Sequence, residues 1–144
     1  LLVCNASPPI RPLAFEPEKL SQFQDFVMRS LSLVSAPMST FLGLLVDQAG
    51  WNIVLSSSFV RELPAVFAHY VTAKCALEGL VNWAAAQYPT VRHCIVRPPK
   101  LVTDQTNTTV GRQGAMEVEQ VAAAIVRQIG QSHKTQGIQI METF

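Results

Sequence analysis

Tyr70 and Lys74, four residues apart, are the residues of this 144-residue chain whose types and spacing are best suited to chemistry. Apolar residues around them recur at helical intervals, so both side chains are expected on one face of a helix. A lysine ammonium beside a phenol favours the phenolate and lowers the tyrosine pKa from about 10. Such a tyrosine can protonate a carbonyl oxygen or accept a proton from an alcohol. The plainer alternative is a lysine that extends to solvent beside a tyrosine at the rim of a helix.

The elements that must position this pair follow from the apolar pattern. Short runs of valine, isoleucine and leucine are typical of buried strands, and apolar residues three and four apart are typical of helices. The expected strands are residues 1–5, 52–58, 91–99 and 137–144, and the expected helices are residues 17–48, bent near Pro37, 67–87 and 116–129. This alternation predicts one α/β domain with a parallel sheet and helices on both faces.

Three polar groups follow the expected strands. They are Asn5 with Ser7, Ser56–Ser58, and Pro98–Asp104. Ligands of open parallel sheets bind outside the carboxyl ends of the strands. The sequence therefore predicts a site that combines these groups with Tyr70 and Lys74.

Composition and charge exclude several classes of partner. The formal net charge is +1 and no run of lysine or arginine occurs, which argues against nucleic acid and anionic membranes as partners. No uninterrupted apolar run approaches the roughly 20 residues that span a bilayer. The cysteines Cys4, Cys75 and Cys94 lack zinc-site spacing and are expected to be small buried hydrophobic residues. We therefore expect a cytoplasmic protein with no membrane partner.

Other candidate residues give weaker evidence for a functional site. His69 could line a substrate pocket beside Tyr70, although partial exposure is the plainer expectation, and His93 and His133 belong to no cluster with metal-ligand spacing. The serines at 56–58 lack the Gly-x-Ser-x-Gly elbow of a hydrolase nucleophile. Neither a metal site nor a serine hydrolase is expected.

Ser57 precedes Tyr70 by thirteen residues, and Lys74 follows Tyr70 by four. This arrangement resembles the active site of the short-chain dehydrogenase/reductase family, in which a serine at a strand end is followed by a tyrosine and a lysine at the same separations. The resemblance extends along the chain. The segment containing Asn5 and Ala6 is similar to the family's Asn-Asn-Ala-Gly turn, and "RPPKLVTD" is similar to its Pro-Gly-x-x-x-Thr segment, with Pro98 and Thr103 retained.

The resemblance implies an enzyme that interconverts a carbonyl and an alcohol on a small molecule, with NADP or NAD as cofactor. By resemblance, Ser57 holds the substrate oxygen, Tyr70 transfers the proton, and Lys74 lowers the tyrosine pKa and holds the nicotinamide ribose. The cofactor-binding residues that it implies are Asn5, Ala6, Tyr70, Lys74, Pro98 and Thr103. The family also implies a homodimer in which the two long helices meet their counterparts across a two-fold axis.

The chain departs from the family pattern at several positions. The family's helix asparagine falls near Arg29 or Ser30, while Ser7 and Pro99 replace glycines. No Gly-x-x-x-Gly-x-Gly turn occurs, so the expected fold is Rossmann-like over residues 1–144 but lacks the N-terminal Gly-rich βαβ portion, which would come from a further partner segment. These departures leave open an alternative, a structural or dimerisation domain without activity. Such a domain could belong to a multidomain synthase.

Overall fold

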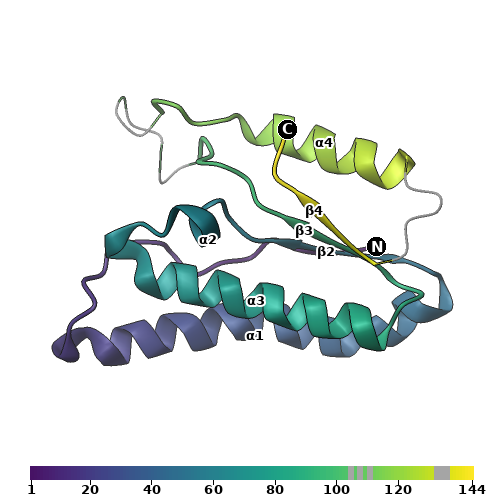
Figure 1. Ribbon diagram of the computed structural model, residues 1–144, viewed down its shortest axis with the longest axis horizontal. Coiled ribbons are helices and arrows are strands. Elements are labelled where there is room, and N and C mark those ends of the chain that lie inside the picture. The colour runs from purple at the N-terminus through teal and green to yellow at the C-terminus, as the bar shows by residue number, and fades with distance from the viewer. Residues whose placement is uncertain (104–105, 107–108, 110–111, 132–136) are drawn as a thin grey trace.

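Four apolar segments form the strands of one sheet, and helices cover both of its faces (Figure 1). The computed structural model describes residues 1–103, 106, 109, 112–131 and 137–144. The strands are β1 (Leu2–Cys4), β2 (Trp51–Leu55), β3 (Arg92–Val96) and β4 (Ile138–Met141). The helices are η1 (Pro17–Lys19), α1 (Leu20–Asp47), α2 (Phe59–Glu62), η2 (Ala65–Phe67), α3 (Ala68–Gln87) and α4 (Val118–Gln131).

The sheet has the strand order β1-β2-β3-β4, and every neighbouring pair is parallel. Cys4 is aligned with Val54, Val54 with Ile95, and Ile95 with Ile140. Because parallel strands end at the same edge, the residues that follow β1, β2 and β3 lie along one side of the sheet. The three polar groups predicted to form the site therefore lie along the same edge of the sheet.

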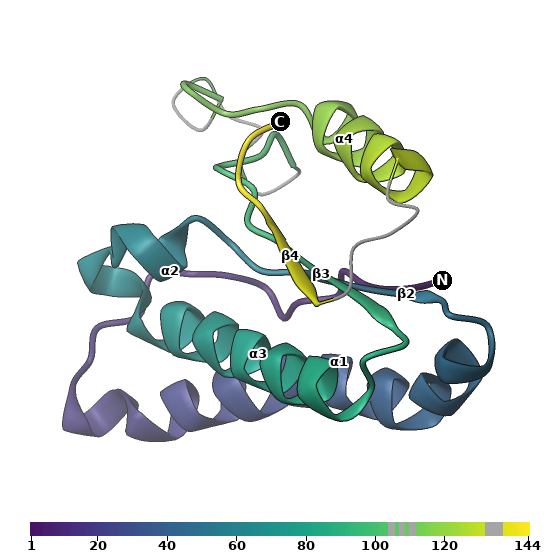
Figure 2. The same cartoon turned by 45° about the vertical axis from the view of Figure 1, so that its right-hand side comes forward.

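Helices α1 and α3 lie side by side against one face of the sheet, in both Figure 1 and Figure 2. The side chains that they bury there recur every three or four residues, as a helix facing a sheet requires. This cluster contains Val34, Met38, Leu42 and Leu45 from α1, Leu77, Val81 and Ala84 from α3, and Val54 and Ile95 from the sheet. Its burial fixes α3, and with it Tyr70 and Lys74, against the sheet.

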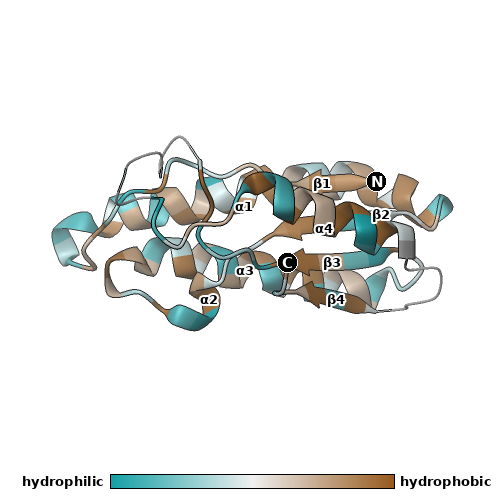
Figure 3. Cartoon of the chain, turned by 90° about the horizontal axis from the view of Figure 1, so that it is seen from above, coloured by the Kyte–Doolittle hydropathy of each residue, from teal (hydrophilic) through white to brown (hydrophobic). Residues whose placement is uncertain are grey.

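Helix α4 covers the opposite face. Val121, Ile125 and Ile129, each four residues apart, pack with Ile53 and Cys94 of the sheet. In Figure 3 brown, the hydrophobic colour, predominates on the strands, whereas the helices carry both brown and teal turns. Apolar side chains on both faces are what a parallel sheet between two helical layers needs.

The predicted fold class is confirmed, and the predicted elements differ from the observed ones mainly at their ends. Trp51 belongs to β2, and the four-residue helix α2 was not predicted. Met116 lies outside α4 because it forms a parallel bridge with Leu101. The prediction that all cysteines are buried is wrong for Cys75, which is exposed because the buried face of α3 runs through Lys74 and Leu77 instead.

One helical segment, Pro17–Asp47, is long and apolar enough to cross a membrane by length and mean hydropathy (1.4) alone. Polar residues interrupt the apolar runs of this segment, so the length of its uninterrupted runs does not mark it in the sequence. In the structure 28% of its most apolar window is buried, through the α1 side chains that pack under the sheet. The same helix exposes other large apolar side chains, namely Leu20, Met28, Leu33, Phe41 and Leu44.

A polar pair is buried inside the sheet layer. Asn52 of β2 and His93 of β3 are aligned neighbours, both with 0% exposure, and Asn52 Nδ2 lies 3.2 Å from His93 Nδ1. Burial lowers the pKa of His93 from its ordinary 6.5, and a hydrogen bond with the Tyr88 backbone opposes part of that change. His93 is therefore neutral in the folded chain at neutral pH.

We predict that the free energy of unfolding falls as the pH is lowered from 7.5 to 5.5. Below about 6.5 the unfolded chain takes up a proton on His93 that the folded chain does not, so each such histidine contributes up to about 1.4 kcal/mol per pH unit. The pKa of His69 is lowered too, mainly by burial, and adds a change of the same sign. Urea unfolding at both pH values measures the effect.

The control for this prediction is His93→Gln, which keeps a hydrogen-bonding side chain beside Asn52 but does not titrate. This variant should lose less stability on acidification than wild type does. Equal losses in the two proteins would show that His93 is not the group responsible.

Candidate active site

Tyr70 lies in the first turn of α3, on the face that this helix turns toward the sheet. The buried residues of α3 recur at intervals of three and four, and His69, Tyr70, Ala73, Lys74, Leu77 and Glu78 all belong to that face. The rings of Phe26 and Phe59 meet the Tyr70 ring edge-on, with centroids 6.3 and 6.0 Å away. The phenol therefore lies in an aromatic enclosure and is only 9% exposed.

Ser57 is buried directly after β2. Its Oγ accepts a hydrogen bond from the backbone N–H of Phe59, with an N–O distance of 3.2 Å. The backbone N–H of Ser58 donates to the Pro98 carbonyl at 3.0 Å, which ties this turn to the end of β3. Ser57 also lies close enough to Tyr70 to lower the pKa of the phenol, so the structure brings these two predicted residues together.

Lys74 lies one turn after Tyr70 on the same face and is 5% exposed. Its Nζ donates to the carbonyl of Leu55, the last residue of β2, at 2.7 Å, and lies 5.5 Å from the centroid of the Tyr70 ring. Burial lowers the pKa of Lys74 to about 8, and the negative charge of Glu78 opposes part of that shift. The alternative of a lysine that extends to solvent is wrong.

The prediction that Tyr70 has a lowered pKa is also wrong in this structure. Burial raises the pKa of the phenol above 10, and Ser57 offsets only part of that rise. The ammonium of Lys74 points one of its protons at the Leu55 carbonyl, while Phe26 and Phe59 keep the phenol away from water. Tyr70 is therefore protonated at neutral pH, the form that donates a proton to a carbonyl oxygen.

The other predicted cofactor residues lie along the same edge of the sheet. Asn5 and Ala6 are exposed directly after β1, and Pro98 is buried just beyond β3. Thr103 is exposed, and its backbone N–H donates to Oγ1 of Thr106 at 2.7 Å. Asp104, the last member of the polar group predicted there, lies outside the described residues, as does His133.

The positions that depart from the family pattern have their own contacts. Arg29 is on the exposed side of α1 and pairs with Asp25, with 2.9 Å between Nη2 and Oδ2. Ser30 is buried, but its Oγ donates to the carbonyl of Phe26 in its own helix at 2.8 Å. Neither side chain forms a described contact with Lys74.

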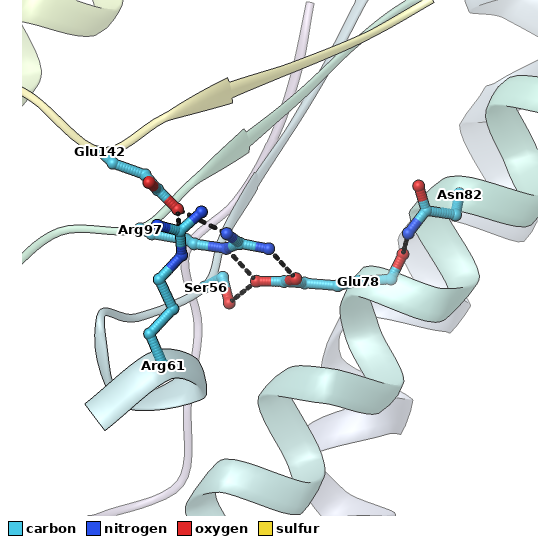
Figure 4. A network of polar contacts seen from close by, with 6 residues as sticks. All are labelled: Ser56, Arg61, Glu78, Asn82, Arg97 and Glu142. Carbon is cyan, nitrogen blue, oxygen red and sulfur yellow. Dashed lines mark hydrogen bonds and ion pairs between the residues drawn. The ribbon is translucent and has the colours of Figure 1, made fainter. Parts of the chain in front are cut away.

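Sequence reasoning overlooked a set of charged residues beside this site. Glu78 lies one turn after Lys74, and its carboxylate binds Ser56 and Arg97 (Figure 4). Helical spacing from Lys74 was a signal that could have marked Glu78, whereas nothing local marks Arg97. The expectation for His69 was wrong as well, because this ring is buried between Phe26 and Phe67 and is only 3% exposed.

Comparison with known proteins identifies the fold of the chain through its structure, but sequence comparison identifies no family. No family model matches the chain, and no curated protein matches it either. Several solved structures are similar to it in three dimensions, although their sequence identity is low. A protein described as belonging to the short-chain dehydrogenase/reductase family has a TM-score of 0.81 at 20% identity, over 98% of this chain and 64% of its own. The chain has the Rossmann-like fold of this structure.

Two further structures support the same assignment of the fold. The alcohol dehydrogenase from the archaeon Thermococcus sibiricus, complexed with 5-hydroxy-NADP, has a TM-score of 0.80 at 18% identity. The acetoin dehydrogenase from Salmonella typhimurium has a TM-score of 0.78 at 18% identity. Each match covers 98% of this chain but only 60% and 62% of the respective structure. The chain therefore spans about three fifths of the length of these proteins.

Proposed function

We propose that this chain is the catalytic portion of an NAD(P)-dependent oxidoreductase that interconverts a carbonyl and an alcohol on a small molecule. The observation that carries the proposal is the meeting of Ser57, Tyr70 and Lys74 at the carboxyl end of β2. The structural neighbours are dehydrogenases by description, which agrees with an oxidoreductase of this kind.

Each of the three residues has a role that its contacts support. The hydroxyl of Ser57 donates a hydrogen bond to the substrate oxygen, beside the phenol. Tyr70, protonated at neutral pH, gives its proton to that oxygen during reduction and takes one during oxidation. Lys74, with a pKa of about 8, holds positive charge near the phenol and stabilises the tyrosinate left after the transfer. The cofactor supplies or accepts the hydride.

The residues of this chain fit the nicotinamide end of such a cofactor. Lys74 uses one of its three N–H donors on the Leu55 carbonyl, so others are available to a ribose hydroxyl. Asn5 and Ala6 are exposed at the same edge, and Pro98 and Thr103 follow β3. The pyrophosphate needs a Gly-rich turn at a helix N-terminus, which this sequence does not contain. We propose that a further N-terminal portion of the same fold supplies it beside β1.

The experiment that tests this function is steady-state reduction of a panel of ketones by the full-length protein, with NADH and NADPH in turn. Calorimetry with each cofactor is run in parallel. Ketone-dependent oxidation of either cofactor supports the proposal, and absence of cofactor binding contradicts it.

The second candidate is a structural or dimerisation domain that keeps the fold without the reaction. The observation that favours it lies near Arg29 or Ser30, where the family has a helix asparagine, because the Ser30 hydroxyl donates to a carbonyl of its own helix. Cofactor binding without turnover of any ketone would favour this candidate. In either case we propose a cytoplasmic protein.

We further propose a homodimer formed through α1 and α3. Leu33 and Leu44 are eleven residues apart on α1, about three turns, so these two exposed side chains share a side of the helix. Trp83 of α3 is 53% exposed. An apolar surface of this kind on two adjacent helices is suited to an isologous interface.

Sedimentation velocity at micromolar concentration tests this prediction. The full-length protein should sediment as a dimer, and Leu44→Glu should sediment as a monomer because it places a charge in the interface. A wild-type protein that is monomeric throughout would rule out the interface.

A further inference from the structure

A network of charged residues joins α3 to the ends of three strands (Figure 4). Arg97, which follows β3, binds both carboxylate oxygens of Glu78, with Nε–Oε1 at 2.8 Å and Nη2–Oε2 at 2.6 Å. The hydroxyl of Ser56, after β2, donates to Oε1 of Glu78 at 2.5 Å. On its other side Arg97 pairs with Glu142, after β4, which also binds Arg61 at 3.0 Å.

Glu78 reaches the same point of the sheet as Lys74. The two residues are one turn apart on the buried face of α3. Lys74 binds the carbonyl of Leu55, and Glu78 binds the hydroxyl of the next residue, Ser56. Carboxylate and ammonium are therefore both anchored where β2 ends, immediately before Ser57.

We propose that Glu78 is a positioning residue for Lys74. Its bonds to Arg97 and Ser56 hold α3 against the ends of β2 and β3, and its negative charge keeps the Lys74 ammonium charged in a buried layer beside Tyr70. The catalytic role of Glu78 rests on the proposed function. Its electrostatic effect on Lys74 can be measured without an enzyme assay.

The electrostatics of the buried layer agree with this role. Burial alone would raise the pKa of Glu78, but hydrogen bonds from Arg97 and Ser56, together with the charges of Arg97 and Arg61, hold it below its ordinary value. Glu78 is therefore ionised at neutral pH and opposes the effect of burial on Lys74. The titratable and charged groups around this layer are His69, Tyr70, Glu78, Arg97, Glu142 and Arg61, and the charged pair on the adjacent α1, Asp25 with Arg29, is exposed.

The two partners of the Glu78–Arg97 pair should affect Lys74 in opposite directions. Glu78→Gln removes a negative charge and leaves Arg97 unbalanced, so the pKa of Lys74 should fall from about 8, by about one pH unit. Arg97→Gln leaves the Glu78 charge unbalanced, so the pKa of Lys74 should rise by a similar amount. A purely structural role of the pair would shift Lys74 in the same direction in both variants.

The measurement is a pH titration of the Lys74 side chain by NMR in the full-length protein with ¹³C-labelled lysine, assigned with Lys74→Arg. Asp25→Asn and Arg29→Gln make the same charge changes in an exposed pair on α1 and should leave Lys74 unaffected. If Arg97→Gln does not fold, Glu78→Asp replaces it, because this variant keeps the charge and shortens the side chain, and its Lys74 pKa should stay closer to that of wild type than the Lys74 pKa of Glu78→Gln. An unchanged Lys74 in Glu78→Gln, or shifts of the same sign in both variants, would overturn the proposal.

Ketone reduction by the same variants separates this inference from the proposed function. If the protein is an enzyme, Glu78→Gln should move the alkaline limb of its kcat profile to lower pH, in parallel with the Lys74 titration. If wild type is inert while Lys74 shifts as predicted, the electrostatic role of Glu78 stands and the proposed function fails.

Discussion

Replacing Tyr70 with phenylalanine is expected to lower carbonyl reduction by the full-length protein about 10²- to 10⁴-fold, the usual contribution of a positioned proton donor. The variant loses one hydroxyl from a ring that Phe26 and Phe59 already surround, so the melting temperature should change little. Cofactor affinity should also stay near that of wild type, which places the loss in the chemical step. Steady-state kinetics, calorimetry and thermal melting of the same preparation measure the three quantities.

The matched control is Tyr88→Phe, because Tyr88 is the other tyrosine of the chain and follows the far end of α3. This variant should keep wild-type turnover. Lys74→Ala should behave differently from Tyr70→Phe, since it removes both a charge beside the phenol and a proposed contact with the ribose. Turnover and cofactor affinity should then fall together. Wild-type turnover in Tyr70→Phe would refute the assignment of the proton donor.

Met38→Ala is expected to be the most destabilising of the variants considered, at about 2–5 kcal/mol. Met38 is 2% exposed and lies in the core between α1, α3 and the sheet. Removing its side chain leaves a cavity in a layer whose packing positions α3, so some of the cost comes from lost contacts that cannot be replaced.

Met28→Ala is the control for this prediction, because it makes the same change in the same helix at a residue that is 62% exposed. Its effect on the free energy of unfolding should be within about 0.5 kcal/mol, as for surface substitutions in general. Urea unfolding of the three proteins at one pH provides the comparison. Similar losses for Met28→Ala and Met38→Ala would mean that α1 does not pack under the sheet as described.

Local sequence patterns were sufficient to predict the layers of this fold. Residues 53–55 and 94–96 are apolar at every position because a parallel sheet is covered on both faces, and such runs can be recognised in the sequence. The helical spacing of apolar residues likewise predicts the buried sides of α1 and α3. The small helix α2 has no such signal, since four residues are too few for a periodic pattern.

The candidate site was predictable in part. The spacing of Ser57, Tyr70 and Lys74 marked three residues that the fold brings together. The pKa of Tyr70 was predicted with the wrong sign, because burial depends on the distant residues Phe26 and Phe59, which no local spacing reveals.

Arg97 illustrates the same difficulty for charged groups. In the sequence it follows a strand and precedes two prolines, which suggests a residue at the start of a loop. Its partner Glu78 is nineteen residues away and on a helix. Only the packing of α3 against the sheet determines that these two charges meet, and that packing is a property of the whole core.

The outer edge of β1 has a consequence for the behaviour of the full-length protein in solution. In the described part of the chain this strand pairs with β2 alone. A strand edge without a partner can template the addition of strands from other molecules and so start aggregation. The N-terminal portion proposed above would cover this edge and so protect the full-length protein from such addition.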